Sequence, residues 1–110
     1  MNDFYCENVF SGKIAVKKAK ETDNILAFYH TKPSWTLHIV IVPKKHIANL
    51  LEANMETIKE IFDVAQQLIE DLELDKKSYK LIVNGGSFQD SQHLHFHLVS
   101  GKRNEDIGEG

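Results

Sequence analysis

Three of the six histidines in this chain of 110 residues alternate with apolar residues near its carboxyl end. Successive side chains of a β-strand point to opposite faces, so an extended segment would place three imidazoles on one face and the apolar residues on the other. Adjacent positive charges repel each other, and we therefore expect the rings to stay mostly neutral near pH 7, with nitrogens available to attack, bind or accept a proton. The histidines are His93, His95 and His97, interleaved with Leu94, Phe96 and Leu98.

A polar loop with two glycines directly precedes this histidine row. It comprises residues 84–87, with the sequence Asn-Gly-Gly-Ser. Glycine permits backbone turns that direct N–H groups toward an anion, which makes Asn84 and Gly86 candidate anion-binding residues. A turn with two glycines is also common where nothing binds. The position of this loop before the histidines favours the binding interpretation.

The elements that position these residues can be predicted from the rest of the sequence. Strand-like segments at 14–20 and 25–30 flank a polar turn, and branched aliphatic residues at 37–42 predict a central strand that ends at Pro43. Apolar residues at 55, 58, 62, 65, 69 and 72 predict one amphipathic helix with Asn54 as its N-cap. Further strands are predicted at 80–83 and about 93–99.

This order of elements predicts an α+β fold in which a mainly antiparallel five-stranded sheet packs against one long helix. A chain of 110 residues is the length of one domain, so we expect a single domain over residues 1–110. We expect a polar, loose tail after about residue 101. If Leu94, Phe96 and Leu98 pack on the helix, the histidine face must open to solvent or to a cleft.

Composition excludes several classes of function. The net charge is −3 and no block of like charge occurs, so we expect no binding to nucleic acid. The longest aliphatic stretch, residues 39–42, is too short for a membrane span, and Met1–Phe10 does not resemble an export signal. Cys6 is the single cysteine and cannot form an internal disulfide. We therefore expect a soluble, cytoplasmic protein with no membrane association.

Several segments together resemble the histidine triad (HIT) family of nucleotide hydrolases and transferases. Residues 93–99 match the family signature His-x-His-x-His-x-x, in which x is apolar. Residues 37–47 are similar to the family segment His-aliphatic-Pro-Lys-x-His, and residues 26–28, Pro33 and residues 83–85 fall at family spacing. The resemblance covers roughly residues 4–101 and points to the short, single-domain nucleotide-binding branch.

The resemblance implies a role for each matching residue. It makes His95 the nucleophile, with His93 and His97 as flanking members of the triad and His38 as a fourth active-site histidine. It places Asn84 and Gln89 on the phosphate and leaving-group side. Phe28 and, more weakly, Val9 would form the wall against the base. The family pattern also implies a homodimer and a nucleotide substrate, such as a purine nucleoside monophosphate conjugate.

The sequence departs from the family pattern at two positions near the expected site. His30 stands where many members carry an aspartate that holds the ribose hydroxyls. Asp90 falls where a hydroxyl residue often contacts phosphate, and a second negative charge there would repel a phosphate unless the side chain points away. The loop before the triad is also about two residues shorter than in well-known members.

These observations lead to one principal hypothesis and two alternatives. We expect a nucleotide hydrolase or transferase that needs no metal or cofactor and acts on a nucleoside phosphoramidate or related bond through a covalent nucleotidyl-His95 intermediate. The first alternative is a binding module for a nucleotide or a partner, with little turnover. The second is a zinc-dependent hydrolase with two row histidines and His38 as ligands.

Overall fold

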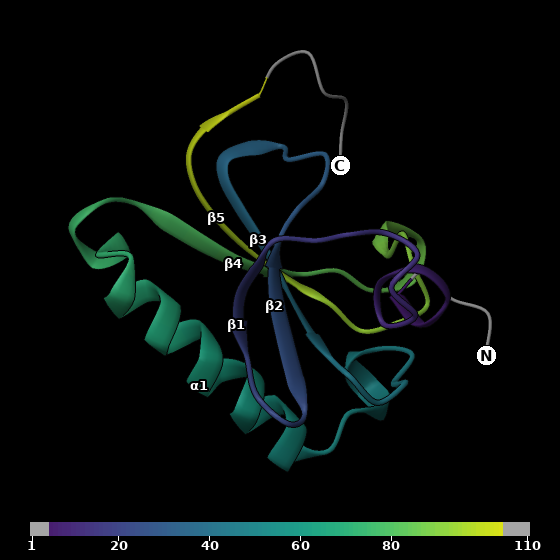
Figure 1. Ribbon diagram of the computed structural model, residues 1–110. Helices are drawn as coiled ribbons and strands as arrows, with labels where there is room; N and C mark the ends of the chain where they lie inside the picture. Colours follow the sequence, from purple (N-terminus) through teal and green to yellow (C-terminus); the bar gives the residue numbers. More distant parts are fainter. Residues whose placement is uncertain (1–4, 105–110) are drawn as a thin grey trace.

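The computed structural model describes residues 5–104 and contains one sheet of five strands. The strand order is β1-β2-β3-β5-β4, and every neighbouring pair is antiparallel (Figure 1). The predicted α+β architecture is therefore confirmed. The strands are β1 (Lys18–Glu21), β2 (Ile25–Tyr29), β3 (Trp35–Pro43), β4 (Tyr79–Val83) and β5 (Phe96–Arg103).

The one α-helix, among the residues described, is α1 (Met55–Asp71) and follows the predicted span closely. The side chain of Asn54 accepts a hydrogen bond from the backbone N–H of Thr57, over 2.8 Å, which caps the first turn as expected. Four residues on one face of the helix are buried. This apolar face arises from the spacing of three and four residues in the sequence; its buried members are Ile61, Val64, Ala65 and Leu68.

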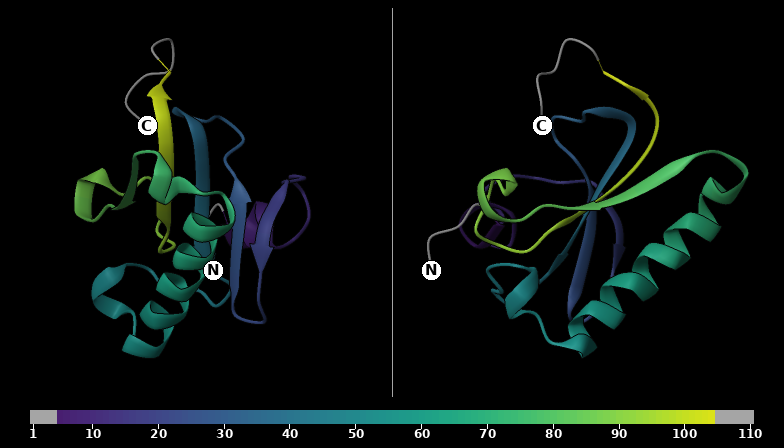
Figure 2. Two further views of the ribbon diagram at one scale, coloured as in Figure 1. Left: turned by 90° about the vertical axis from the view of Figure 1, so that its left-hand side faces the viewer. Right: turned by 180° about the vertical axis from the view of Figure 1, so that it is seen from behind.

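The strand β3 lies centrally, as its aliphatic sequence predicted, and it is covered on both faces. Ile39 and Ile41 pack in the cluster that contains the buried face of α1, and Leu98 of β5 joins them. Val40 and Val42 point to the other face, where they join a second cluster. A turn at Tyr5–Val9, η1, supplies part of this second cluster. Figure 2 shows α1 crossing one face of the sheet, with η1 on the other face.

The last strand begins later than the sequence suggested. We expected it at 93–99, but β5 starts at Phe96, so His93 and His95 precede the strand. In the observed register Phe96 pairs with Ile41, which would place Leu94 opposite Pro43. Proline has no N–H to donate, so the ladder stops before that pair. Leu94 instead donates its N–H to the carbonyl oxygen of Ile47, over 2.7 Å.

β5 also continues further than expected, through a β-bulge. The pairing with β3 shifts register between Trp35 and Leu37, which leaves one extra residue on β5. Gly101 lies in this bulge with φ +86, and an added Cβ there would lie 2.7 Å from Cβ of Thr36. The strand then runs to Arg103, so the predicted end at 99 is wrong. Most of the expected loose tail falls outside the described residues.

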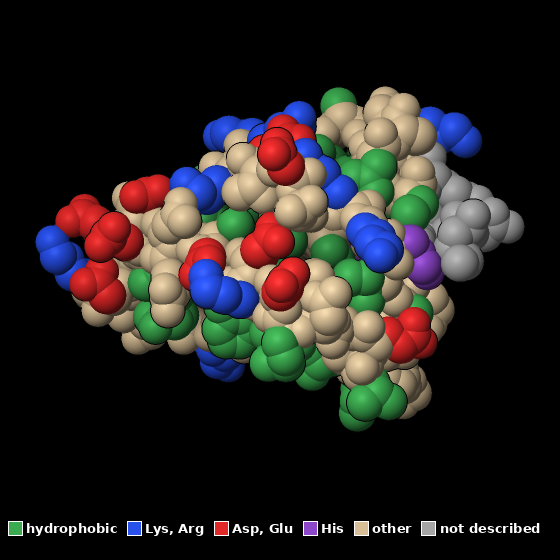
Figure 3. All heavy atoms as spheres, turned by 90° about the horizontal axis from the view of Figure 1, so that it is seen from below, with side chains coloured by type: hydrophobic (Ala, Val, Ile, Leu, Met, Phe, Trp, Pro, Cys, Tyr) green, Lys and Arg blue, Asp and Glu red, His purple; other side chains and the backbone are tan. Residues whose placement is uncertain are grey.

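The first strand is shorter than predicted. We expected it over 14–20, whereas β1 covers Lys18–Glu21. Ile14 donates its N–H to the carbonyl oxygen of Asn8, over 2.9 Å, so this part of the chain holds η1 and does not extend the sheet. Within residues 5–104, no helix has both the length and the apolar character needed to cross a membrane. On the face seen in Figure 3, acidic and basic side chains are interspersed.

Candidate active site

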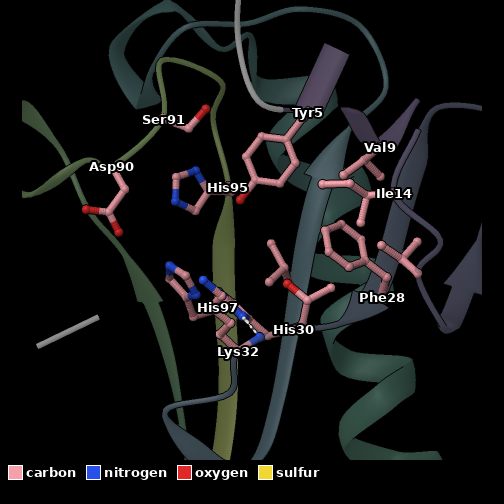
Figure 4. A pocket seen from close by; sticks show the side chains of 13 residues that line it. Tyr5, Val9, Ile14, Phe28, His30, Lys32, Asp90, Ser91, His95 and His97 are labelled. Atoms are coloured by element: carbon pink, nitrogen blue, oxygen red, sulfur yellow. Dashed lines mark hydrogen bonds between the residues drawn. The ribbon is translucent and has the colours of Figure 1, made fainter. Parts of the chain in front are cut away.

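A pocket of about 320 Å³ lies on the face of the sheet opposite α1. Its floor comes from β2, β3 and β5, and η1 forms part of its wall (Figure 4). Apolar side chains line one half, and titratable or hydroxyl side chains line the other. The apolar lining is Val9, Ile14, Val16, Phe28 and Val40, and the polar lining is His30, Thr31, Lys32, Asp90, Ser91, His95 and His97. Tyr5 lies beside His95 and adds an aromatic ring that carries a hydroxyl.

His95, which lines this pocket, has one unprotonated ring nitrogen with a free lone pair. The residue is 4% exposed, and its Nδ1 lies 2.7 Å from the backbone oxygen of His93. A carbonyl oxygen can only accept, so the neutral ring carries its proton on Nδ1. The lone pair is therefore on Nε2. The ring centroid lies 5.3 Å from that of Tyr5.

His97, in contrast to His95, carries its proton on Nε2, because a chain of hydrogen bonds fixes the position of that proton. The backbone N–H of Ser34 donates to Nδ1 of His38, over 2.9 Å, so the proton of neutral His38 lies on Nε2. That Nε2 lies 2.9 Å from Nδ1 of His97 and donates to it. The proton of His97 must then be on Nε2, which is buried and has no hydrogen-bond partner among the described residues. His97 thus offers an N–H donor.

His30 is a fourth ring whose tautomer is fixed by a hydrogen bond. The backbone N–H of Lys32 donates to Nδ1 of His30, over 2.9 Å, which leaves the proton on Nε2. The centroid of this ring lies 4.5 Å from that of His38 and 6.3 Å from that of His97. The expected sugar-side residue therefore lies in the pocket beside the two catalytic candidates.

Burial keeps these rings neutral. Desolvation, followed by the nearby rings of His95, His38 and His30, lowers the pKa of His97 to about 3. Desolvation and His30 lower the pKa of His38 to about 4. Burial also lowers the pKa of His95, although its bond to the carbonyl of His93 and the charge of Asp90 oppose this effect. The expectation of a mostly neutral row is supported for these rings.

His93 does not share the pocket with the other two members of the triad. It is fully buried, and its Nε2–H donates to the backbone oxygen of Pro43, over 2.7 Å. Our expectation that all three rings open into one hollow is therefore wrong for His93. The alternation argument requires an extended strand, and the ladder ends at Phe96, so it does not reach His93. His93 acts on the pocket through its backbone oxygen, which holds His95.

His93 instead lies in a cluster of metal-type donors. One ligand atom each from Cys6, His46 and His93 lies within 4.8 Å of the others, and Sγ of Cys6 is 3.7 Å from Nδ1 of His93. One thiol and two imidazoles are suited to Zn²⁺. Within residues 5–104, this convergence does not occur at His38, the ligand that our zinc hypothesis required. The three residues are far apart in sequence, and no spacing pattern signals them.

Three predicted phosphate-side residues lie outside the pocket lining. Gln89 is buried, and its amide donates to the backbone oxygens of Ala48 and Ser91, over 2.6 and 2.8 Å, so it anchors the loop before the histidines. Gly86 is exposed at φ +59, and Asn84 follows β4. Their contacts with a nucleotide remain predictions. Phe28 and Val9, in contrast, lie in the apolar wall as expected.

Sequence reasoning missed part of the lining. Tyr5 lies beside His95 in Figure 4, yet the two residues are ninety positions apart and share no pattern. Lys32 and Thr31 belong to the connection between β2 and β3, which offered no chemical signal. Asp90 and Ser91 line the pocket from the loop before β5. Our suggestion that Asp90 could point away is therefore not supported.

Comparisons with known proteins agree with this geometry. The model of the HIT domain family matches residues 11–104. A HIT-like protein of Helicobacter pylori is 31% identical over 105 residues, which cover 94% of this chain and 99% of that protein. Adenosine 5′-monophosphoramidase hnt1 of Schizosaccharomyces pombe is 29% identical, covering all of this chain and 81% of that one. The crystal structure of a HIT family hydrolase from Legionella pneumophila superimposes with a TM-score of 0.83 at 33% identity, over 93% and 95% of the two chains.

Proposed function

This chain belongs to the HIT domain family, and from that premise we propose that it hydrolyses or transfers a nucleoside monophosphate from a phosphoramidate or related conjugate. The observation that carries the proposal is the opposite polarity of two neighbouring rings. His95 offers a lone pair at Nε2, and His97 offers an N–H at Nε2, with ring centroids 5.1 Å apart. A nucleophile beside an oxyanion donor is the minimum that phosphorus chemistry requires.

The first step of the proposed reaction forms a covalent intermediate. Nε2 of His95 attacks phosphorus, the bond from phosphorus to the leaving nitrogen breaks, and the departing amine takes a proton from solvent. The intermediate is a nucleotidyl-histidine whose Nδ1–H still donates to the carbonyl of His93. That bond stabilises the positive charge that develops on the ring.

The second step regenerates the enzyme. Water attacks phosphorus, the bond to Nε2 of His95 breaks, and one proton returns to solvent. In both steps Nε2–H of His97 donates to a non-bridging phosphoryl oxygen. His38 holds this proton in place from behind and does not line the pocket. A pre-oriented donor of this kind typically accounts for about 10²–10³ in rate.

The apolar half of the pocket is suited to a nucleoside base. Phe28 is 3% exposed, and Val9 and Val40 flank it. A flat aromatic base would bury its faces against these side chains. The yeast relative named as an adenosine 5′-monophosphoramidase supports a purine. We therefore propose an adenosine 5′-phosphoramidate as the first substrate to test.

Mass spectrometry of protein quenched during turnover tests the proposal. We expect an added nucleoside monophosphate mass on the peptide that contains His95. His95→Asn should abolish turnover and still bind nucleoside monophosphate. Undiminished hydrolysis by this variant would contradict the proposal.

A binding module with little turnover is the second candidate. Asp90 favours it, because a carboxylate in the lining opposes the approach of an anionic phosphate. Calorimetry with adenosine monophosphate, together with a phosphoramidate hydrolysis assay, separates the two functions. Binding without hydrolysis by the wild-type protein would favour the module.

A further inference from the structure

In the polar half of the pocket, the hydrogen-bond donors and the carboxylate of Asp90 lie on different sides of His95. Lys32 and the N–H donors of His30 and His97 lie on one side of His95. Asp90 lies on the other side, away from Phe28, as Figure 4 shows. Within residues 5–104, no cationic side chain forms an ion pair with Asp90. Among the residues that the structure describes, none therefore pairs with the negative charge that Asp90 brings to the pocket lining.

The position of Asp90 matches the path of a leaving group. If the base occupies the apolar wall and the phosphoryl oxygens face His97, the remaining substituent on phosphorus extends toward the exposed rim. Asp90 is exposed at that rim. It is also the carboxylate whose charge acts on His95 and His30, opposing the lowering of the pKa of each ring.

We propose that Asp90 selects substrates whose leaving group carries a positive charge, such as a phosphoramidate of a diamine or of a basic amino acid. This inference rests on the proposed hydrolysis of nucleotide conjugates. A cation on the leaving group forms an ion pair with Asp90 and offsets the repulsion between Asp90 and the phosphate. An anionic leaving group adds to that repulsion and is rejected.

Three conjugates of equal length test this selection. Adenosine 5′-phosphate is joined through a P–N bond to 1,4-diaminobutane, butylamine or 4-aminobutanoate, which leaves a cationic, neutral or anionic far end. We expect the wild-type kcat/KM for the cationic conjugate to exceed that for the neutral one by about three- to fivefold, as for an exposed ion pair. The anionic conjugate should be the poorest. High salt should reduce the ratio toward one.

The variant Asp90→Asn separates charge from shape. We expect its cationic-to-neutral ratio to fall to about one, because the amide keeps the size of the side chain and removes its charge. Asp63→Asn, on the exposed face of α1, is the matched control and should keep the wild-type ratio. A wild-type ratio of one, or an unchanged ratio in Asp90→Asn, would overturn the inference.

A binding measurement keeps the two proposals apart. Hydrolysis of all three conjugates at equal rates contradicts only the role of Asp90. Hydrolysis of none contradicts the proposed function. In that case the Kd values of the three conjugates for His95→Asn decide the question, since the charge preference does not depend on turnover. Equal Kd values would then overturn the role of Asp90, and tighter binding of the cationic conjugate would support it.

Discussion

His38 donates a hydrogen bond from Nε2 to Nδ1 of His97, over 2.9 Å, and thereby determines which nitrogen of His97 carries the proton that faces the pocket. The bond itself is directed by the backbone N–H of Ser34. A main-chain group two residues beyond the pocket-lining loop at Thr31–Lys32 thus sets the polarity of the site through two rings.

Replacing His38 should lower activity, because His38 fixes the tautomer of His97. His38→Ala leaves His97 free to hold its proton on Nδ1, and we expect kcat/KM to fall by about 10²-fold. His38→Gln retains a donor and should recover part of this loss. Nitrogen NMR of the His97 ring reports the tautomer directly. Equal loss in both variants with an unchanged His97 spectrum would show that His38 acts only through packing.

Stability should decline in acid because of the neutral rings. The pKa of His97 is lowered to about 3 and that of His38 to about 4, whereas both titrate near 6.5 in the unfolded chain. Between these values the unfolded state binds more protons, so the free energy of unfolding rises with pH. The contribution of the two neutral rings to the free energy of unfolding is fully present above about pH 6.5. It falls as the pH drops toward 4, with a slope of up to about 1.4 kcal/mol per pH unit for each ring.

Urea unfolding at pH 7.5, 6 and 5 measures this slope. His38→Gln removes one titrating ring and should give a shallower dependence, relative to its own stability at pH 7.5. Equal free energies of unfolding at pH 7.5 and 5 for the wild-type protein would contradict the assignment of neutral buried rings.

Chelation should leave hydrolysis intact. Nε2–H of His97 supplies the donor for the phosphoryl oxygen, and the metal-type donors Cys6, His46 and His93 converge outside the pocket lining. We expect kcat to change by less than about twofold after EDTA treatment, because no step of the proposed reaction uses a metal ion. Loss of activity that Zn²⁺ restores would favour the zinc-dependent alternative.

Alanine variants of two glycines should distinguish the cost of backbone strain from the cost of steric contact. Gly101 and Gly12 both have positive φ, +86 and +82, but a Cβ at Gly101 meets Thr36 at 2.7 Å, whereas one at Gly12 meets nothing within 4 Å. Both alanine variants should lose about 1–2 kcal/mol from the left-handed conformation. Gly101→Ala should lose about 1–3 kcal/mol more from the contact. Equal midpoints of urea unfolding would contradict this account of the bulge.

The two edges of the sheet predict how the chain self-associates. β1 exposes two charged residues, Lys18 and Glu21, which discourage pairing, whereas β4 exposes the aromatic Tyr79 beside one charged residue, Lys80. Phe62 of α1 is also 45% exposed and packs against Phe96, the residue of β5 that pairs with the other end of β4. We propose that the expected homodimer forms along β4. Light scattering after size exclusion should give twice the chain mass, and Tyr79→Lys combined with Phe62→Lys should give a monomer. An unchanged mass for this variant would place the interface elsewhere.

Periodic patterns predicted the fold because they reflect local geometry. The helix followed from apolar spacing and from Asn54, and β3 followed from aliphatic residues on both faces. The packing of Phe96 and Leu98 against the α1 side of the sheet followed from strand alternation. Each of these features is determined by residues within one element, so the chain itself carries the signal.

The features that failed depend on contacts between distant segments. Strand alternation predicted that His93 shares a face with His95 and His97. The partner strand of β5 ends in proline, so the ladder stops at Phe96 and the His93 ring does not enter the pocket. The apposition of Tyr5 with His95 and of Cys6 with His93 exists only after η1 packs on the sheet. No residue pattern along the chain predicts such long-range contacts.

The placement of η1 makes the pocket depend on contacts between segments far apart in the sequence. Tyr5 and His95 are ninety positions apart, and both line the pocket. Closing so long a loop costs chain entropy that contacts within one element do not. The pocket is therefore complete only when η1 and β5 pack on the same sheet, and a local detachment of η1 would remove Tyr5 and Val9 from its wall.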